Sequence, residues 1–202
     1  MNYINRSVDF FLNELKEKKP IPGGGSVSAL SGALACGLLA MVCAFSYKKK
    51  APEKALKIIE KRSIQRLNKL EDLIEEDIKG YKSFSLIIKS KRRDKKAIRK
   101  ALLRTLKAPL DVLRLMPPSM DDAKKITKFS KDNIISDVAV AASLILACFE
   151  GAVFNVMINL KALGDEKLST ALNREIKGLK KKLTAGKKSL LLKVDKRLTK
   201  SV

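Results

Sequence analysis

Histidine and tryptophan are absent from the 202-residue sequence. Without imidazole, a proton transfer near neutral pH has to use a carboxyl, lysine, cysteine or tyrosine side chain, or water. Cysteine is also scarce, because only three occur and no two of them form a CxxC pair. A zinc site requires four protein ligands, or three and a water, and no such set is visible. The sequence therefore predicts no metal site and no tightly bound cofactor.

The cysteines and the first residues of the chain indicate the cellular compartment. Cys36, Cys43 and Cys148 are odd in number and lie in apolar stretches, which is typical of small core residues in a reducing environment. Residues 1–19 are amphipathic and include three acidic side chains, whereas a signal peptide has a continuous apolar segment. We therefore expect a cytoplasmic protein.

Acidic residues are far fewer than basic ones. The chain has 21 Asp and Glu against 43 Lys and Arg, a formal net charge of +22. A charge of this size concerns partners and solubility rather than the fold. It suits nucleic acid, an anionic membrane surface or an anionic small molecule, and also a lysine-rich surface without a specific partner. Nucleic acid is the less favoured partner, because no known binding motif is present and aromatic residues are scarce.

One stretch, residues 20–47, organises the rest of the chain. It begins with Pro20-Ile21-Pro22, which cannot continue a helix, and Gly23, Gly24 and Gly25 follow with wide backbone freedom. We predict Ser26 as the N-cap of a charge-free helix from Val27 to Tyr47. A glycine loop that leads into a helix N-terminus offers free N–H groups to an anion or a polar ligand. The alternative is a plain loop followed by a core helix.

The charge-free helix is long enough to cross a bilayer, and Lys48, Lys49 and Lys50 would suit its cytoplasmic end. Its small residues recur every four positions, so that another helix can approach one face closely. No second charge-free stretch of that length occurs. We therefore expect a buried helix of a bundle and no membrane span.

Apolar periodicity predicts helices along the rest of the chain, and no segment alternates like a strand. Prolines are expected to interrupt the fourth helix, with a kink at Pro109 and an end at Met116-Pro117-Pro118. The expected helices are Val8 to about Lys18 after the cap Ser7, Glu53 to Ile88, about Asp94 to Leu115, Ser119 to Phe129 after a capping box with Asp122, and Ile134 to Leu160. The part from about residue 165 is basic and amphipathic, with an end that frays. The predicted fold class is all-α: one helical-bundle domain over residues 1–202 with two long buried apolar helices.

Asp77 interrupts an apolar stripe of the helix 53–88. The stripe consists of Leu67, Leu70, Ile74, Asp77, Tyr81, Phe84 and Ile88. A buried carboxyl either finds a cationic partner or becomes protonated, because desolvation disfavours its charged form. Shifted pKa values are concentrated at functional sites, so Asp77 is a candidate catalytic residue, and Tyr81 one turn later faces the same way. The alternative is a structural salt bridge, and the pattern does not separate the two.

One acid and three amides near the second apolar helix are further candidates. Asp137 lies in its first turn, where an acid ordinarily stabilises the helix dipole, and Asn133 also fits a plain turn or cap. Asn155 and Asn159 are neighbours on one face, which suits a ligand or an oligomer interface equally. Asp137 and Asn155 share a face but lie about 27 Å apart along the axis. Either one of them is structural, or an elongated ligand spans both, or a second subunit brings them together.

These motifs together resemble the formiminotransferase-cyclodeaminase C-terminal family. The matching residues are Pro20-x-Pro22-Gly23-Gly24-Gly25-Ser26-Val27, Asp77-x-x-Gly80-Tyr81, Ala108-Pro109-Leu110, Asn133-x-x-Ser136-Asp137 and Gly151-Ala152-x-x-Asn155-x-x-x-Asn159. Spaced matches in the correct order are more specific than the glycine loop alone. There are departures: Gly80 stands where alanine is usual, Lys131-Asp132 replace a glycine-asparagine start, and residues 165–202 match weakly.

The resemblance implies a helical enzyme that acts on tetrahydrofolate. The family's cyclodeaminases close 5-formiminotetrahydrofolate to 5,10-methenyltetrahydrofolate and release ammonia, and its cyclohydrolases open the methenyl ring with water. The residues that it implies are Asp77 and Asp137 for catalysis, and Gly23, Gly24, Gly25, Ser26, Tyr81, Asn133, Asn155 and Asn159 for substrate binding. The small-residue face, the paired asparagines and the family all favour a homodimer.

The positive charge fits this function, because folates carry glutamate carboxylates, often several. We expect five cations to hold such a polyglutamate tail: Lys91, Arg92, Arg93, Lys95 and Lys96. Two alternatives stay open. One is a non-enzymatic basic helical module that binds nucleic acid, which explains the charge but neither Asp77 nor the glycine loop. The other is a family member that binds folate without activity.

Overall fold

The computed structural model describes residues 3–47, 53–90 and 94–199. These residues form six α-helices and one short 3-10 helix, with no strand among them, which confirms the all-α class. The elements are α1 (Val8–Lys16), α2 (Gly24–Phe45), α3 (Glu53–Lys89), α4 (Lys95–Ile126), η1 (Asp132–Ile134), α5 (Ile135–Leu163) and α6 (Glu166–Leu198).

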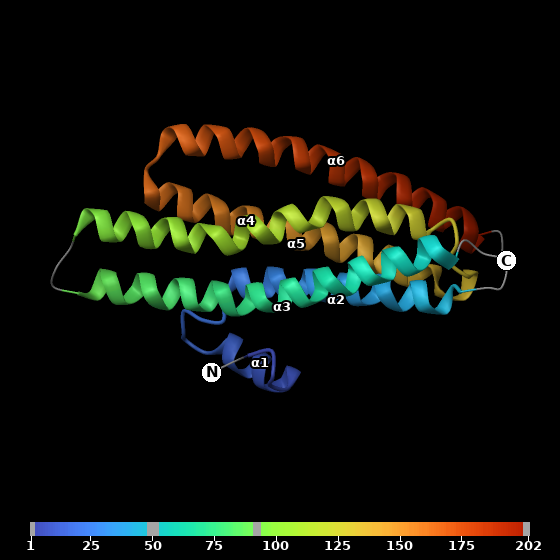
Figure 1. The fold of residues 1–202 in the computed structure, drawn as a ribbon, viewed down its shortest axis with the longest axis horizontal. Helices are drawn as coiled ribbons and strands as arrows, with labels where there is room; N and C mark the ends of the chain where they lie inside the picture. The colour runs from blue at the N-terminus through green and yellow to red at the C-terminus, as the bar shows by residue number, and fades with distance from the viewer. Residues whose placement is uncertain (1–2, 48–52, 91–93, 200–202) are drawn as a thin grey trace.

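The five long helices lie side by side along one axis and alternate in direction, whereas α1 lies outside the bundle on one flank (Figure 1). Helix α2 packs mainly against α3 and α5, α4 packs mainly against α5 and α3, and α6 covers α5 and α4. The end of α3, the start of α4, the end of α5 and the start of α6 lie toward the same end of the bundle (Figure 1). The N-terminus of α2 therefore faces the halves of α3, α4 and α5 that lie toward that end.

Small side chains bring α2 close to its neighbours, as the four-residue pattern predicts. A Cβ atom at Gly32 would lie only 2.8 Å from Cys148 Sγ on α5, so this crossing accepts no larger residue. Cys36, Cys43 and Cys148 are buried and free. Their expected role as core residues is confirmed.

Helix α4 runs without interruption through Pro109, Pro117 and Pro118, so the predicted end at residues 116–118 is wrong. Each proline removes a backbone donor and crowds the preceding turn, which costs local helix stability. Burial outweighs that cost, because Pro117 itself is buried together with Met116 and Met120 on either side of the pair. Packing against the rest of the bundle decides this element, and the local sequence does not contain that information.

The predicted capping box at Ser119 and Asp122 is also wrong. Ser119 Oγ donates to Leu115 O inside the same helix. Asp122 is buried and accepts hydrogen bonds of 2.8 Å each from Arg62 Nη2 and Arg66 Nη1 on α3. The acid that resembled a capping residue is an ionic link between α3 and α4.

The C-terminal part forms α6, which is helical to Leu198 and begins after the N-cap Asp165. Its buried residues, Leu172, Ile176, Leu183, Leu190 and Val194, follow a helical stripe toward α4 and α5. The predicted amphipathic packing is confirmed, and residues 200–202, at the end that we expect to fray, lie outside the described residues.

Two segments, Gly24–Phe45 and Asp132–Leu163, are long and apolar enough to cross a membrane, with mean hydropathies of 2.1 and 1.9. Half of the apolar window of the first and 39% of that of the second are buried among the other helices. A core helix of a bundle passes the same test, so length and composition do not separate the two interpretations.

Candidate functional site

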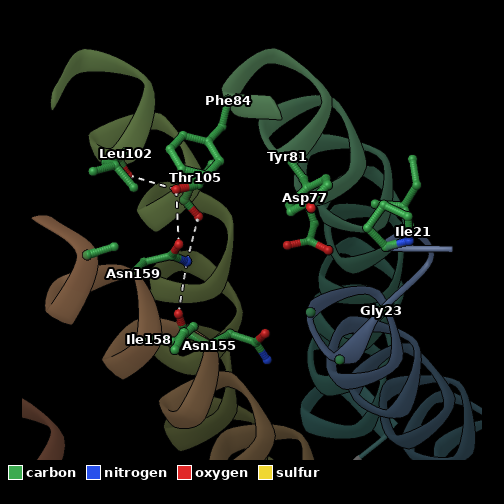
Figure 2. Close-up of a pocket in the computed structure, with 14 residues that line it drawn as sticks. Ile21, Gly23, Asp77, Tyr81, Phe84, Leu102, Thr105, Asn155, Ile158 and Asn159 are labelled. Atoms are coloured by element: carbon green, nitrogen blue, oxygen red, sulfur yellow. Dashed lines mark hydrogen bonds between the residues drawn. The ribbon is translucent and has the colours of Figure 1, made fainter. Parts of the chain in front are cut away.

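A cavity of about 330 Å³ opens where the N-terminus of α2 meets α3, α4 and α5. Figure 2 shows its walls, with Asp77 on α3 opposite Asn155 and Asn159 on α5, and the glycine turn below Asp77. The predicted site residues that line it are Gly23, Gly24, Gly25, Asp77, Tyr81, Asn155 and Asn159. Segments far apart in the sequence therefore contribute to one cavity.

The carboxyl of Asp77 is the centre of this cavity. Ser26 Oγ donates a hydrogen bond of 3.1 Å to Asp77 Oδ2, and the Ser26 backbone N–H bonds to the same carboxyl. Burial raises the pKa of Asp77, and the two bonds from Ser26 act in the opposite direction. Within the described ranges no ion pair involves Asp77, so the alternative of a structural salt bridge finds no support.

Helix α2 begins at Gly24, with Gly23 as an extended N-cap that has no side chain to bond the first turn. The prediction that Ser26 caps the helix is therefore wrong. Ser26 lies inside the first turn and is 0% exposed, with its hydroxyl turned toward α3. The glycines allow the helix to start earlier, because Gly25 packs directly against Asp77. A Cβ atom at Gly25 would lie 2.6 Å from Asp77 Cγ.

A polar wall lies across the cavity on α5 and α4. Asn159 Nδ2 donates to Asn155 O at 2.9 Å, and Thr105 Oγ1 on α4 donates to Asn159 Oδ1 at 3.2 Å. Asn155 Nδ2 donates to Gly151 O at 2.8 Å. The side chain of Asn155 extends into the space in front of Asp77 (Figure 2). A Cβ atom at Gly24 would lie 3.6 Å from this amide, so Asn155 also packs against the first turn of α2.

Tyr81 lines the cavity one turn after Asp77, and its side chain is 37% exposed. No hydrogen bond joins it to Asp77 in the part of the chain that the structure describes. The stripe predicted as core-facing is buried at Leu70 and Ile74 but opens to the cavity and solvent from Tyr81 to Ile88. The C-terminal part of this stripe therefore forms one wall of the cavity.

Asn133 and Asp137 lie away from the cavity, at the opposite end of α5. Asn133 is exposed in η1, and Asp137 is half-buried in the first turn of α5. The separation of about 27 Å along the helix, expected from the sequence, keeps Asp137 apart from Asn155 within one chain. Ordinary helix stabilisation by an acid in the first turn explains its position.

Thr105 is a polar residue of the cavity wall that is not among the predicted site residues. It is 9% exposed in a stripe with the buried residues Ala101, Leu102 and Leu106. A buried hydroxyl in such a stripe is a signal like that of Asp77, since it also needs a partner. Gly80 on α3 lies opposite, where a Cβ atom would be 3.6 Å from Thr105 Cα. This is an ordinary van der Waals distance, so the contact between α3 and α4 does not require a glycine here.

Comparison with known proteins agrees with this geometry. The model of the formiminotransferase-cyclodeaminase family matches residues 7–178. A methenyltetrahydrofolate cyclohydrolase from Methylorubrum extorquens is 29% identical over 87% of this chain and 89% of its own length. The formimidoyltransferase-cyclodeaminase of Gallus gallus is 26% identical over 96% of this chain, which spans only 38% of that longer protein.

A solved structure shares the fold over nearly its whole length. The crystal structure of formiminotetrahydrofolate cyclodeaminase from Thermotoga maritima superposes with a TM-score of 0.81 and 30% identity, covering 97% of each chain. The family match spans the glycine turn, Asp77 and both asparagines, which are the elements that form the cavity. The chain belongs to the formiminotransferase-cyclodeaminase family.

Proposed function

We propose that this protein acts on tetrahydrofolate that carries a one-carbon unit, and that it forms or opens the bridge of 5,10-methenyltetrahydrofolate. The observation that carries the proposal is the unpaired, hydrogen-bonded carboxyl of Asp77 in a cavity lined by backbone and amide groups. The names of the relatives support it, since they are a methenyltetrahydrofolate cyclohydrolase and formiminotetrahydrofolate cyclodeaminases.

Asp77 supplies the proton transfer in this proposal. In the cyclodeaminase reaction N10 of the folate attacks the formimino carbon and loses its proton to the Asp77 carboxylate. The carboxyl then returns the proton to the departing nitrogen, which leaves as ammonia. One carboxyl serves both steps, and such general acid–base catalysis contributes about 10²–10⁴-fold. The ionised form also stabilises the cationic methenyl product.

The cyclohydrolase reaction uses the same groups on the same ring. Asp77 takes a proton from water as it attacks the methenyl carbon, and returns it to the ring nitrogen that is released. The hydroxyl on the tetrahedral carbon gives its proton to solvent as the formyl C=O forms. Both reactions pass through a tetrahedral carbon between N5 and N10. The two overall reactions differ in whether an amino group leaves or water adds.

Polar contacts to the substrate come from the remaining walls of the cavity. The first N–H groups of α2 at Gly24 and Gly25 point out of the helix end, where they bond a carbonyl or carboxylate oxygen. Asn155 offers an amide that can both donate and accept, which suits the pyrimidine edge of a pterin. Tyr81 and Phe84 supply flat apolar surface for the ring system.

Absorbance at the methenyl-folate band separates the two reactions. The purified protein receives 5-formiminotetrahydrofolate in one cuvette and 5,10-methenyltetrahydrofolate in another. Accelerated growth of the band in the first cuvette establishes a cyclodeaminase, and accelerated decay only in the second establishes a cyclohydrolase. No change in either cuvette would reject the enzymatic proposal for these substrates and favour a folate-binding protein without activity.

A homodimer belongs to the same proposal. The apolar helices α2 and α5 expose Leu34, Met41, Phe45, Val140 and Phe154 to solvent. A groove of about 470 Å³ lies along α2, with Leu67 and Glu71 of α3 and Leu144 of α5 in its walls. A second copy that covers this largely apolar face would bury it without bringing cations together. It would also give Asn133 and Asp137 a place next to another subunit.

A further inference from the structure

Ser26 lies behind the wall of the cavity, and substrate binding does not explain its position. Its side chain is 0% exposed, so it cannot contact a molecule in the cavity. Its hydroxyl nevertheless points at the carboxyl of Asp77 and donates to Oδ2 at 3.1 Å. A buried hydroxyl aimed at one carboxyl acts on that carboxyl, and so its effect on chemistry passes through Asp77.

The glycine turn restricts the same carboxyl from the other side. A Cβ atom at Gly25 would come closest to Oδ1 of Asp77 and would lie 2.6 Å from both Cγ and Oδ2. The carboxyl group therefore rests on the bare Cα of Gly25, and the first turn of α2 holds it between this contact and the Ser26 hydroxyl. Oδ2 thus accepts a hydrogen bond from Ser26, and Oδ1 lies nearest to Gly25.

We propose that Ser26 is a positioning residue that fixes Oδ2 of Asp77 and so orients the carboxyl that exchanges protons with the folate. This inference rests on the proposed function, in which Asp77 is the proton-transfer group. The hydroxyl keeps its own proton throughout and remains a donor to Oδ2. Gly25 takes part by leaving the space that the carboxyl fills.

The other groups that face Asp77 cannot substitute for Ser26. From α2 they are glycine backbone, from α4 Thr105, and from α5 Asn155 and Asn159, none of which titrates. Among the described residues that line the cavity, Tyr81 is the other titratable one. Glu76, the neighbour of Asp77 on α3, is paired with Lys69 and Lys107. No cation thus faces the carboxyl within the described part of the chain, and Ser26 provides its hydrogen bonds.

Removing the hydroxyl has two separate consequences. The bond from Ser26 favours the ionised carboxyl, so its loss raises the pKa of Asp77 further above the ordinary range. The acidic limb of the pH–rate profile, which reports the ionisation of the base, then moves to higher pH. Either oxygen of the freed carboxyl can also turn away from the substrate, which lowers kcat even where Asp77 is fully ionised.

The test compares Ser26→Ala and Ser26→Cys with Ser31→Ala. Ser31 is a matched control on the same helix, because its hydroxyl donates to Val27 O and not to the cavity. The pKa of Asp77 is measured by carbon-13 NMR of the aspartate carboxyls, with its signal assigned from its absence in Asp77→Asn. The pH dependence of kcat and KM is measured on the same samples.

We expect Ser26→Ala to raise the pKa of Asp77, to move the acidic limb of kcat/KM, which reports the free enzyme, by the same amount, and to lower the plateau of kcat about ten-fold or more. KM changes little, because Ser26 does not touch the substrate. Ser26→Cys retains a weaker donor and gives intermediate values, and Ser31→Ala resembles the wild type.

Two results would overturn the inference. One is a folded Ser26→Ala protein with an unchanged carboxyl titration, and the other is a shifted titration that the pH–rate profile does not follow. Failure of the proposed function looks different, because the wild type then turns over neither folate. The NMR titration still decides in that case whether Ser26 holds the carboxyl.

Discussion

At the scale of single residues, Asp77 makes folding depend on pH in an unusual direction. Its pKa is raised in the folded protein by burial, so the folded state binds this proton more tightly than the unfolded chain does. Stability therefore falls as pH rises from the unfolded pKa through the higher folded pKa. Ionisation of Asp77 therefore lowers the free energy of unfolding.

Asp77→Asn should consequently separate stability from activity. We expect activity to fall by about 10²–10⁴-fold, whereas the melting temperature at pH 7.5 rises above that of the wild type. The gain narrows as pH falls through the raised pKa of Asp77, because the wild-type carboxyl is then protonated as well. Calorimetry between pH 7.5 and pH 4 checks this, and a variant less stable than the wild type at pH 7.5 would contradict it.

Gly25→Ala tests whether the missing side chain matters. A methyl group there needs the space of the Asp77 carboxyl, so we expect the carboxyl to be displaced and activity to be lost while circular dichroism stays helical. Gly178→Ala is the matched control on α6, where nothing lies within 4 Å. It should raise stability by about 1 kcal/mol and leave activity intact. Equal activities of the two variants would argue against the contact.

At the scale of elements, the link between α3 and α4 depends on Asp122. Its side chain is 3% exposed and bonds both Arg62 and Arg66. Asp122→Ala leaves these guanidinium groups without their partner, and we expect the free energy of unfolding to fall by about 3 kcal/mol. Asp121→Ala removes only exposed pairs, with Lys182 and Lys124, and should cost less than about 1 kcal/mol.

Urea denaturation of both variants measures the difference. None of Asp122, Arg62 and Arg66 lines the cavity, so Asp122→Ala should keep its activity well below its melting temperature. A loss no larger than that of Asp121→Ala would show that the cluster is ordinary surface charge.

Helix positions were predictable from the sequence where local signals set them. Ser7 caps α1, as expected. Helix α4 begins at Lys95, next to its predicted start at about Asp94, and α3 follows its apolar stripe almost to the predicted residue. The continuation of α4 through three prolines was not predictable, because tertiary burial determines it. The start of α2 two residues before Ser26 was missed for a similar reason, since it depends on the contact of Gly25 with a helix fifty residues away.

The candidate site was predictable in part. Asp77, Asn155 and Asn159 were visible because each is polar at an apolar position, which is a local signal. Their meeting in one cavity depends on how α3 and α5 are placed along each other, and no single-helix pattern contains that register. Asn133 and Asp137 show where sequence motifs fail to predict a site. Both match the family motif, but they lie at the end of α5 away from the cavity.

At the scale of the whole molecule, the net charge of +22 opposes self-association, whereas the exposed apolar residues of α2 and α5 favour it. Like charges oppose association, and salt screens them. We therefore expect a homodimer whose dissociation constant falls as salt is raised, measured by sedimentation velocity. Leu34→Glu places a charge on the exposed α2 face and should give a monomer, whereas Leu192→Glu on α6, similarly exposed, should not. A monomeric wild type at all salt concentrations would refute the proposal.

The basic segment before and at the start of α4 is proposed to recognise the glutamate tail of the folate. Lys95 and Lys96 are exposed at the start of α4, and Lys91, Arg92 and Arg93 lie outside the described residues. Changing all five to glutamine should raise KM for polyglutamated folate more than for the monoglutamate, with the difference shrinking at high salt. Steady-state kinetics with both substrates decides this, and equal increases in KM would contradict tail recognition.

The contact between Gly25 and Asp77 also has a consequence for inheritance. Every amino-acid replacement that one base change can make in a glycine codon introduces a side chain, and at this position any side chain enters the space of the carboxyl. Every single-base change in this codon that alters the amino acid is therefore expected to disturb the carboxyl. A related protein can lose the proposed activity by one such substitution and keep the helical bundle. A residue other than glycine at this position is therefore expected to mark a relative without that activity.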